Sequence, residues 1–171
     1  MTPEMRLTLA AVIGSWVMVG ATIWSIWAQS KNAHKSLSVQ IAFELDKQWD
    51  SSEMRRARQK LATLLLDKKP VSDYRVLDLF EKVGLYANQR DVDEYKVYSA
   101  FSDLTEYYWI AGQSAIKVAR EETRGRDYYV DFESLYKKVL ARQAKETGKP
   151  EGAVSPEDIR GFLTEEKTLS D

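Results

Sequence analysis

The chain has 171 residues, a formal net charge of −1, no cysteine and a single histidine, His34. A nearly neutral chain has no net electrostatic attraction for nucleic acid or anionic lipid, and a chain without cysteine forms neither disulfides nor thiolate metal sites. A single histidine also excludes most metal sites and catalytic triads. From the charge, the missing cysteines and the single histidine together, we expect no catalytic residue, no metal, no cofactor and no nucleic-acid partner.

An uncharged stretch runs from Leu7 to Ala28, after a short N-terminal tail at residues 1–6. At ~1.5 Å per residue it forms a helix about 33 Å long, enough to cross a hydrocarbon core of ~30 Å. A cleaved signal peptide is the alternative, but its apolar region has only about 7–15 residues. The sequence therefore predicts one transmembrane helix over residues 7–28.

Basic residues flank this stretch unevenly. Arg6 precedes it, whereas Lys31 and Lys35 follow it without a nearby acid. Because basic flanks stay in the cytoplasm, we predict an integral membrane protein that crosses once and carries its C-terminal domain in the cytoplasm.

Small residues line one face of the same helix, at Ala10, Gly14, Ala21 and Ser25. Two pairs among them have the four-residue spacing that lets membrane helices approach closely. This face predicts a homodimer, and the alternative is that small residues are simply frequent in membrane helices.

Residues 36–145 show helical spacing of apolar residues almost throughout and strand alternation almost nowhere. The pattern predicts a compact all-α domain of about five helices. Their apolar positions are, in chain order, Leu37, Ile41, Leu45 and Trp49; Met54, Ala57, Leu61, Leu64 and Leu65; Val76, Leu77, Phe80 and Val83; Val97, Phe101, Leu104, Tyr108, Ala111, Ala115 and Val118; and Tyr129, Phe132, Leu135, Tyr136 and Val139.

Boundaries between these helices follow from capping residues and breakers. Asp50 has the spacing of a capping box with Glu53, and the two serines after it compete as caps. Gly84 marks the end of its helix or a bend in it. The stretch Asp91–Arg124 forms one long helix, or two with a restart at Ser102.

Residues 146–171 form a linker and a short amphipathic helix. Ser155 has the character of an N-cap, with Pro156 at the first helical position. The small apolar face of this helix, at Ile159, Phe162 and Leu163, either docks on the domain or binds a partner.

Two clusters are candidate surfaces. The basic run Arg55, Arg56, Arg58 and Lys60 is a candidate lipid contact, with an ordinary solvated helix face as the alternative. The consecutive aromatics Tyr107, Tyr108 and Trp109 are candidate partner contacts, because a helix cannot bury three successive residues on one face. Rings half buried at the edge of the core are the alternative.

Catalytic and ligand-binding motifs are missing from the sequence. The acidic stretch that begins at Asp91 fails as a calcium loop, since Tyr95, Lys96 and Ser102 occupy three of its diagnostic positions. There is no glycine-rich phosphate loop and no nucleophile elbow.

The segments "WDSSEMRRAR", "LDLFEKVGLYANQRDVD" and "TEYYWI" carry a resemblance to a known family. With Trp49, Glu53, Phe80, Gly84 and Trp109 in place, the chain resembles the bacterial family DUF4760 from Ser36 to about Arg142. The resemblance implies a bacterial origin, a helical fold often preceded by one membrane helix, and no assigned activity.

These observations predict a non-enzymatic scaffold or adaptor domain, anchored in the bacterial inner membrane, that binds another protein. One alternative is a carboxylate-dependent hydrolase acting at the membrane, which a cleft lined by carboxyls of raised pKa would favour. The other is a sensor of anionic lipid that uses the basic run.

Overall fold

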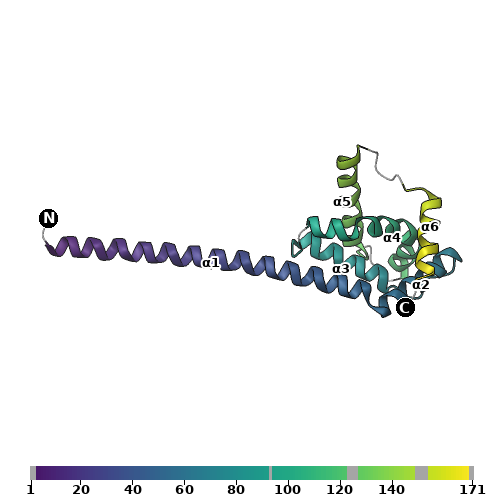
Figure 1. The fold of residues 1–171 in the computed structure, drawn as a ribbon, viewed down its shortest axis with the longest axis horizontal. Coiled ribbons are helices and arrows are strands. Elements are labelled where there is room, and N and C mark those ends of the chain that lie inside the picture. The colour runs from purple at the N-terminus through teal and green to yellow at the C-terminus, as the bar shows by residue number, and fades with distance from the viewer. Residues whose placement is uncertain (1–2, 93, 123–126, 149–153, 170–171) are drawn as a thin grey trace. The chain divides into compact units, whose positions relative to one another are not determined.

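The computed structural model describes residues 3–92, 94–122, 127–148 and 154–169, without the side chains of residues 3–17, 19–21, 32, 34, 94 and 147. This part of the chain contains six helices and no strand (Figure 1). The helices are α1 (Pro3–Asp50), α2 (Ser52–Leu66), α3 (Arg75–Gln89), α4 (Glu94–Glu122), α5 (Val130–Thr147) and α6 (Pro156–Lys167). The prediction of an all-α protein is therefore confirmed.

The predicted transmembrane helix over residues 7–28 is wrong. Where the structure describes the chain, none of the helices is both long enough and apolar enough to span a bilayer. The backbone of residues 7–28 is one part of α1, which continues unbroken past Lys31 to Asp50.

The chain divides into two compact units, Met1–Val39 and Gln40–Asp171. In the first unit, the described part of α1 leaves Ile23, Trp24, Ile26 and Trp27 exposed. The rings of Trp24 and Trp27 lie 5.5 Å apart, centroid to centroid.

The second unit begins with the last turns of α1, which place Leu45 and Trp49 in its core. Of the three predicted caps, the structure selects Ser51, whose hydroxyl accepts a hydrogen bond from the Met54 backbone N–H at 3.1 Å. This cap lets the chain turn and begin α2 directly after α1.

Phe80 of α3 lies at the centre of the second unit. Its ring centroid lies between 5.0 and 6.4 Å from those of Trp49, Phe101, Tyr108 and Phe132. These four rings come from α1, α4 and α5, so this aromatic cluster joins four helices into one core.

Gly84 lies inside α3 and does not end it. A Cβ atom at this position would lie 2.5 Å from the Asp131 carbonyl carbon and 3.0 Å from the Phe132 nitrogen. Glycine is therefore required because the backbones of α3 and α5 approach closely here.

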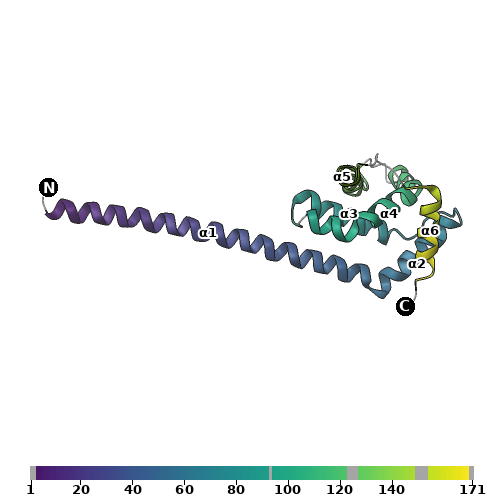
Figure 2. The ribbon, with the colours of Figure 1, turned by 45° about the horizontal axis from the view of Figure 1, so that its top comes forward.

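The stretch after Asp91 forms α4 as one uninterrupted helix, with no restart at Ser102. The last helix, α6, packs against α2 and also contacts α4 (Figure 2).

Candidate protein-interaction site

A buried ion pair holds α6 against α2. Arg58 donates from Nε to Glu166 Oε2 at 2.7 Å and from Nη2 to Glu166 Oε1 at 2.6 Å. Tyr108 of α4 donates from its hydroxyl to Oε2 at 2.7 Å. Arg58 is 8% exposed and Glu166 is 5% exposed, so the Glu166 carboxylate is enclosed by donors and shielded from water.

The environment keeps both donors in the protonated form. Burial alone lowers the pKa of Arg58, but the hydrogen bond and the charge of Glu166 outweigh this effect and leave the pKa above its ordinary value. Burial raises the pKa of the Tyr108 phenol well above its usual value, and the Glu166 carboxylate adds to this effect. The phenol therefore stays a donor, and Arg58 stays charged.

Aromatic rings hold the same face of α6 one turn before Glu166. Phe162 stacks on Tyr107 with centroids 4.7 Å apart and meets Tyr108 edge to face at 5.0 Å. Leu163 beside it is 5% exposed. Because Phe162 and Glu166 are four residues apart, they project from the same face of α6.

The receiving surface is called the α6 seat below, and it consists of Trp49, Arg58, Tyr107 and Tyr108. The guanidinium carbon of Arg58 lies 3.9 Å from the ring centroid of Trp49, so a cation–π interaction with the indole helps to orient the guanidinium. Gln59 also donates to the backbone oxygen of Leu169 beyond the end of α6.

Local sequence prepares α6 for this position. The Ser155 hydroxyl accepts from the Asp158 backbone N–H at 3.1 Å, and the Asp158 carboxylate accepts from the Ser155 backbone N–H at 2.9 Å. Such a capping box satisfies two backbone donors and stabilises the first turn. The predicted N-cap at Ser155 is confirmed.

Two of the three predicted partner-contact aromatics, Tyr108 and Trp109, do not lie on the surface. Tyr108 is fully buried and Trp109 is 7% exposed, whereas Tyr107 is half buried under Phe162. The prediction assumed that only one face of the helix is covered. In the structure α4 has α3 and α5 on one side and α6 on another, so consecutive residues are all covered.

The basic run does not form one exposed surface. Arg58 faces the core, whereas Arg55 donates to the backbone oxygen of Asp50 at 2.9 Å. Lys60 is exposed, with Nζ 4.0 Å from the Asp73 carboxylate, Arg56 is also exposed, and Arg55 is half buried. The candidate lipid contact therefore loses Arg58, because its partner Glu166 arrives from α6.

The predicted dimer face lies mostly outside the described side chains. The structure gives no side-chain placement for Ala10, Gly14 and Ala21. Ser25 is exposed and accepts a hydrogen bond from Gln29 at 3.1 Å. The homodimer through this face stays a prediction.

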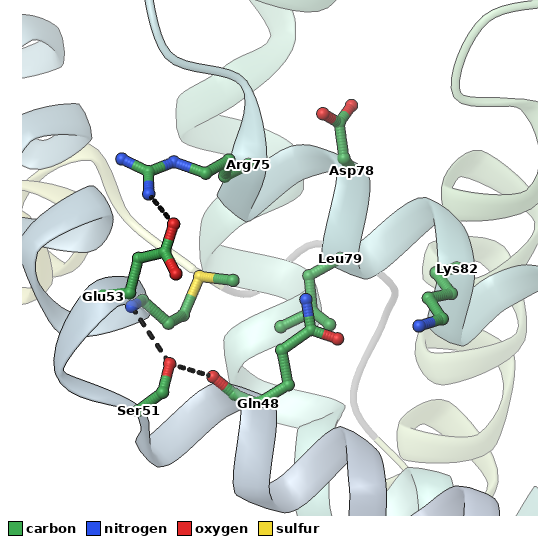
Figure 3. Close-up of a pocket in the computed structure, with 8 residues that line it drawn as sticks. Gln48, Ser51, Glu53, Arg75, Asp78, Leu79 and Lys82 are labelled. Atoms are coloured by element: carbon green, nitrogen blue, oxygen red, sulfur yellow. Dashed lines mark hydrogen bonds and ion pairs between the residues drawn. The ribbon is translucent and has the colours of Figure 1, made fainter.

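The second unit has clefts on its surface, and two of them are described by their lining residues. The smaller, of about 240 Å³, lies between the α1–α2 corner and α3, and Figure 3 shows Glu53 and Arg75 joined beside it while Asp78 and Lys82 lie apart from this pair. The larger, of about 620 Å³, lies between the α2–α3 connection and α4. Its lining residues are Leu65, Lys68, Lys69, Pro70, Val71, Tyr74, Ala111, Ser114, Ala115, Val118 and Glu122.

Carboxyls of raised pKa lie away from both clefts. Burial raises the pKa of Glu81, although Glu81 accepts from the backbone nitrogens of Asp131 and Phe132 at the start of α5. Burial likewise raises the pKa of Glu106 on α4. Neither residue is among those that line these two clefts.

In the described part of the chain, no group of three or more His, Cys, Asp or Glu side chains is placed to hold a metal ion.

Glu166 was not predicted as a site residue from the sequence. The sequence feature that could have identified Glu166 is its position on the apolar face of α6, three residues after Leu163 and four after Phe162.

Comparison with known proteins adds one match. A family model described as "Domain of unknown function (DUF4760)" matches residues 12–139. No curated protein and no solved structure matches the chain. The α6 seat lies within the matched residues, whereas Phe162 and Glu166 lie beyond them.

Proposed function

The chain belongs to the DUF4760 family, whose function is unknown, and on that premise we propose that it is a non-enzymatic interaction domain whose α6 seat holds a helical segment of another protein. In the structure this seat is filled by α6, a helix of the same chain. An interaction domain of this kind serves as a scaffold or adaptor.

One observation carries the proposal. Every residue of the α6 seat lies within residues 12–139, which match the family, whereas the helix that fills it lies outside that range. The seat nevertheless encloses its occupant with a paired charge, a phenol donor and two aromatic rings. Helices that lie in grooves on other proteins are recognised in this way, through anchors spaced three or four residues apart.

The affinity of the seat is bounded by its own occupancy. A segment on a short linker experiences an effective concentration in the millimolar range. We therefore expect the dissociation constant of the same helix as a separate peptide to lie below roughly 1 mM, since α6 would be mostly undocked at weaker affinity.

A binding experiment tests the proposal. The full chain with Phe162→Ala and Leu163→Ala loses the apolar anchors of α6, which frees the seat. We expect a fluorescently labelled peptide of residues 154–169 to bind this chain saturably, one peptide per chain, and the unaltered chain far more weakly. Absence of saturable binding up to about 1 mM peptide, in a chain that circular dichroism shows to be folded, would refute the proposal.

A further inference from the structure

We propose that the α6 seat recognises partner helices by one signature, an aromatic residue followed four positions later by a glutamate, and that α6 is an internal competitor carrying that signature. This inference rests on the proposed function and names the partner chemistry of the same site. The partner is a helical segment of another protein.

The carboxylate is read by three donors whose geometry excludes close substitutes. Both oxygens of Glu166 accept hydrogen bonds, two from Arg58 and one from Tyr108. A glutamine would turn an NH₂ group toward one of these donors, and that donor would lose its acceptor in a site closed to water. The guanidinium would also lose its counter-charge, because Glu166 is its ion-pair partner.

The aromatic residue is read by the ring pair of α4. Phe162 lies against the face of Tyr107 and the ring of Tyr108, at 4.7 and 5.0 Å between centroids. Tyr108 therefore contacts both parts of the signature, with its ring on Phe162 and its hydroxyl on Glu166. This shared contact sets the spacing of four residues, one turn of a helix.

The seat residues are oriented by the core as well as by α6. Trp49 supports the Arg58 guanidinium at 3.9 Å, and Tyr108 packs on Phe80 with centroids 5.4 Å apart. Trp49 and Phe80 belong to the central aromatic cluster, which α6 does not build. Because these core contacts do not depend on α6, we expect Arg58 and Tyr108 to keep their orientation when α6 undocks. A helix of another protein would then bind a preorganised site.

Tethering makes α6 a strong competitor. A partner helix that makes the same contacts competes with tethered α6, whose effective concentration at the seat is in the millimolar range. A partner present at micromolar concentration therefore does not displace α6 from the unaltered chain. Weakening α6 by a given factor raises the apparent affinity for an external helix by about the same factor, until α6 is mostly undocked. Release of α6 therefore controls access to the seat.

The test compares two adjacent glutamates of the full chain. Glu166→Gln removes the buried carboxylate, and Glu165→Gln makes the same charge change at an exposed position. The probe is the labelled peptide of residues 154–169. We expect the Glu166→Gln chain to bind it about 10- to 100-fold more tightly than the unaltered chain, and the Glu165→Gln chain to bind it like the unaltered chain.

Peptide variants then test each half of the signature on the Glu166→Gln chain. A peptide with glutamine at position 166, and another with alanine at position 162, should each bind about tenfold or more weakly. Introducing Arg58→Met into this chain should abolish the preference for glutamate over glutamine. If that variant fails to fold, Tyr108→Phe, which removes one hydroxyl, should reduce the same preference.

The outcomes separate the inference from the proposed function. If all these peptides bind the Glu166→Gln chain equally, the signature is wrong while the interaction domain stands. If no peptide binds this chain or the chain with Phe162→Ala and Leu163→Ala, both proposals fail. If light scattering shows dimers that the peptide converts to monomers, the occupant is α6 of a second copy, and the inference of a separate partner protein is overturned.

Discussion

Replacing Gly84 by alanine tests the closest helix contact of the fold. The added Cβ would lie 2.5 Å from the Asp131 carbonyl carbon, whereas ordinary van der Waals contact begins at 3.4 Å. The obstacle is backbone, so α3 and α5 must separate by about 1 Å. Overpacking of this kind costs roughly 3 kcal/mol or more, and the better helix propensity of alanine returns about 1 kcal/mol. We expect a net loss of at least about 2 kcal/mol in the free energy of unfolding.

Urea unfolding followed by circular dichroism measures this loss, with thermal unfolding as a second readout. A loss of this size lowers the melting temperature by roughly 5–10 °C. Gly161→Ala is the matched control, because Gly161 also lies inside a helix, and nothing lies within 4 Å of its added Cβ. We expect that variant to gain up to about 1 kcal/mol.

Two outcomes would contradict the close approach of α3 and α5. If Gly84→Ala is as stable as the unaltered chain or more stable, the backbones of α3 and α5 do not approach as closely as described. A loss of equal size in both variants would place the cause in the helices themselves and not in the contact between them.

Three further predictions concern single residues. Burial raises the pKa of Glu106 in the folded state, so the contribution of Glu106 to the free energy of unfolding is complete below the usual carboxyl pKa range and is lost as pH rises through the raised pKa. Glu106→Gln should remove this pH dependence from urea unfolding. A pH profile that the substitution leaves unchanged would contradict this prediction. Ser155→Ala should cost about 1 kcal/mol and increase amide hydrogen exchange in the first turn of α6, whereas unchanged exchange there would count against the capping box. Arg90 ends α3 at a φ of 61°, so Arg90→Gly should raise the free energy of unfolding by about 0.5 kcal/mol, and a loss in urea unfolding would mean that this backbone conformation is not strained.

Structural elements that depend on local interactions could be predicted from the sequence. Apolar spacing identified the helices of the second unit, and the cap at Ser155 was correct to the residue, because capping depends on atoms within one turn. The same local logic failed over residues 7–28, where an apolar run became part of a longer helix and where no described helix meets the requirements of a membrane span. Local sequence also did not decide whether α4 is one helix or two. Ser102 is a possible N-cap, but whether the helix breaks there depends on tertiary packing.

Tertiary structure alone decided the site. Arg58 and Glu166 are 108 residues apart in the chain, so neither the spacing nor the composition around Arg58 distinguishes it from the exposed basic residues beside it. The same holds for the hydrogen bond of Tyr108 to Glu166, which the apolar pattern of α4 does not predict, and for Gly84, whose necessity comes from the backbone of α5. Local interactions set where helices begin and end, whereas the partner of a buried charge depends on which helices pack together.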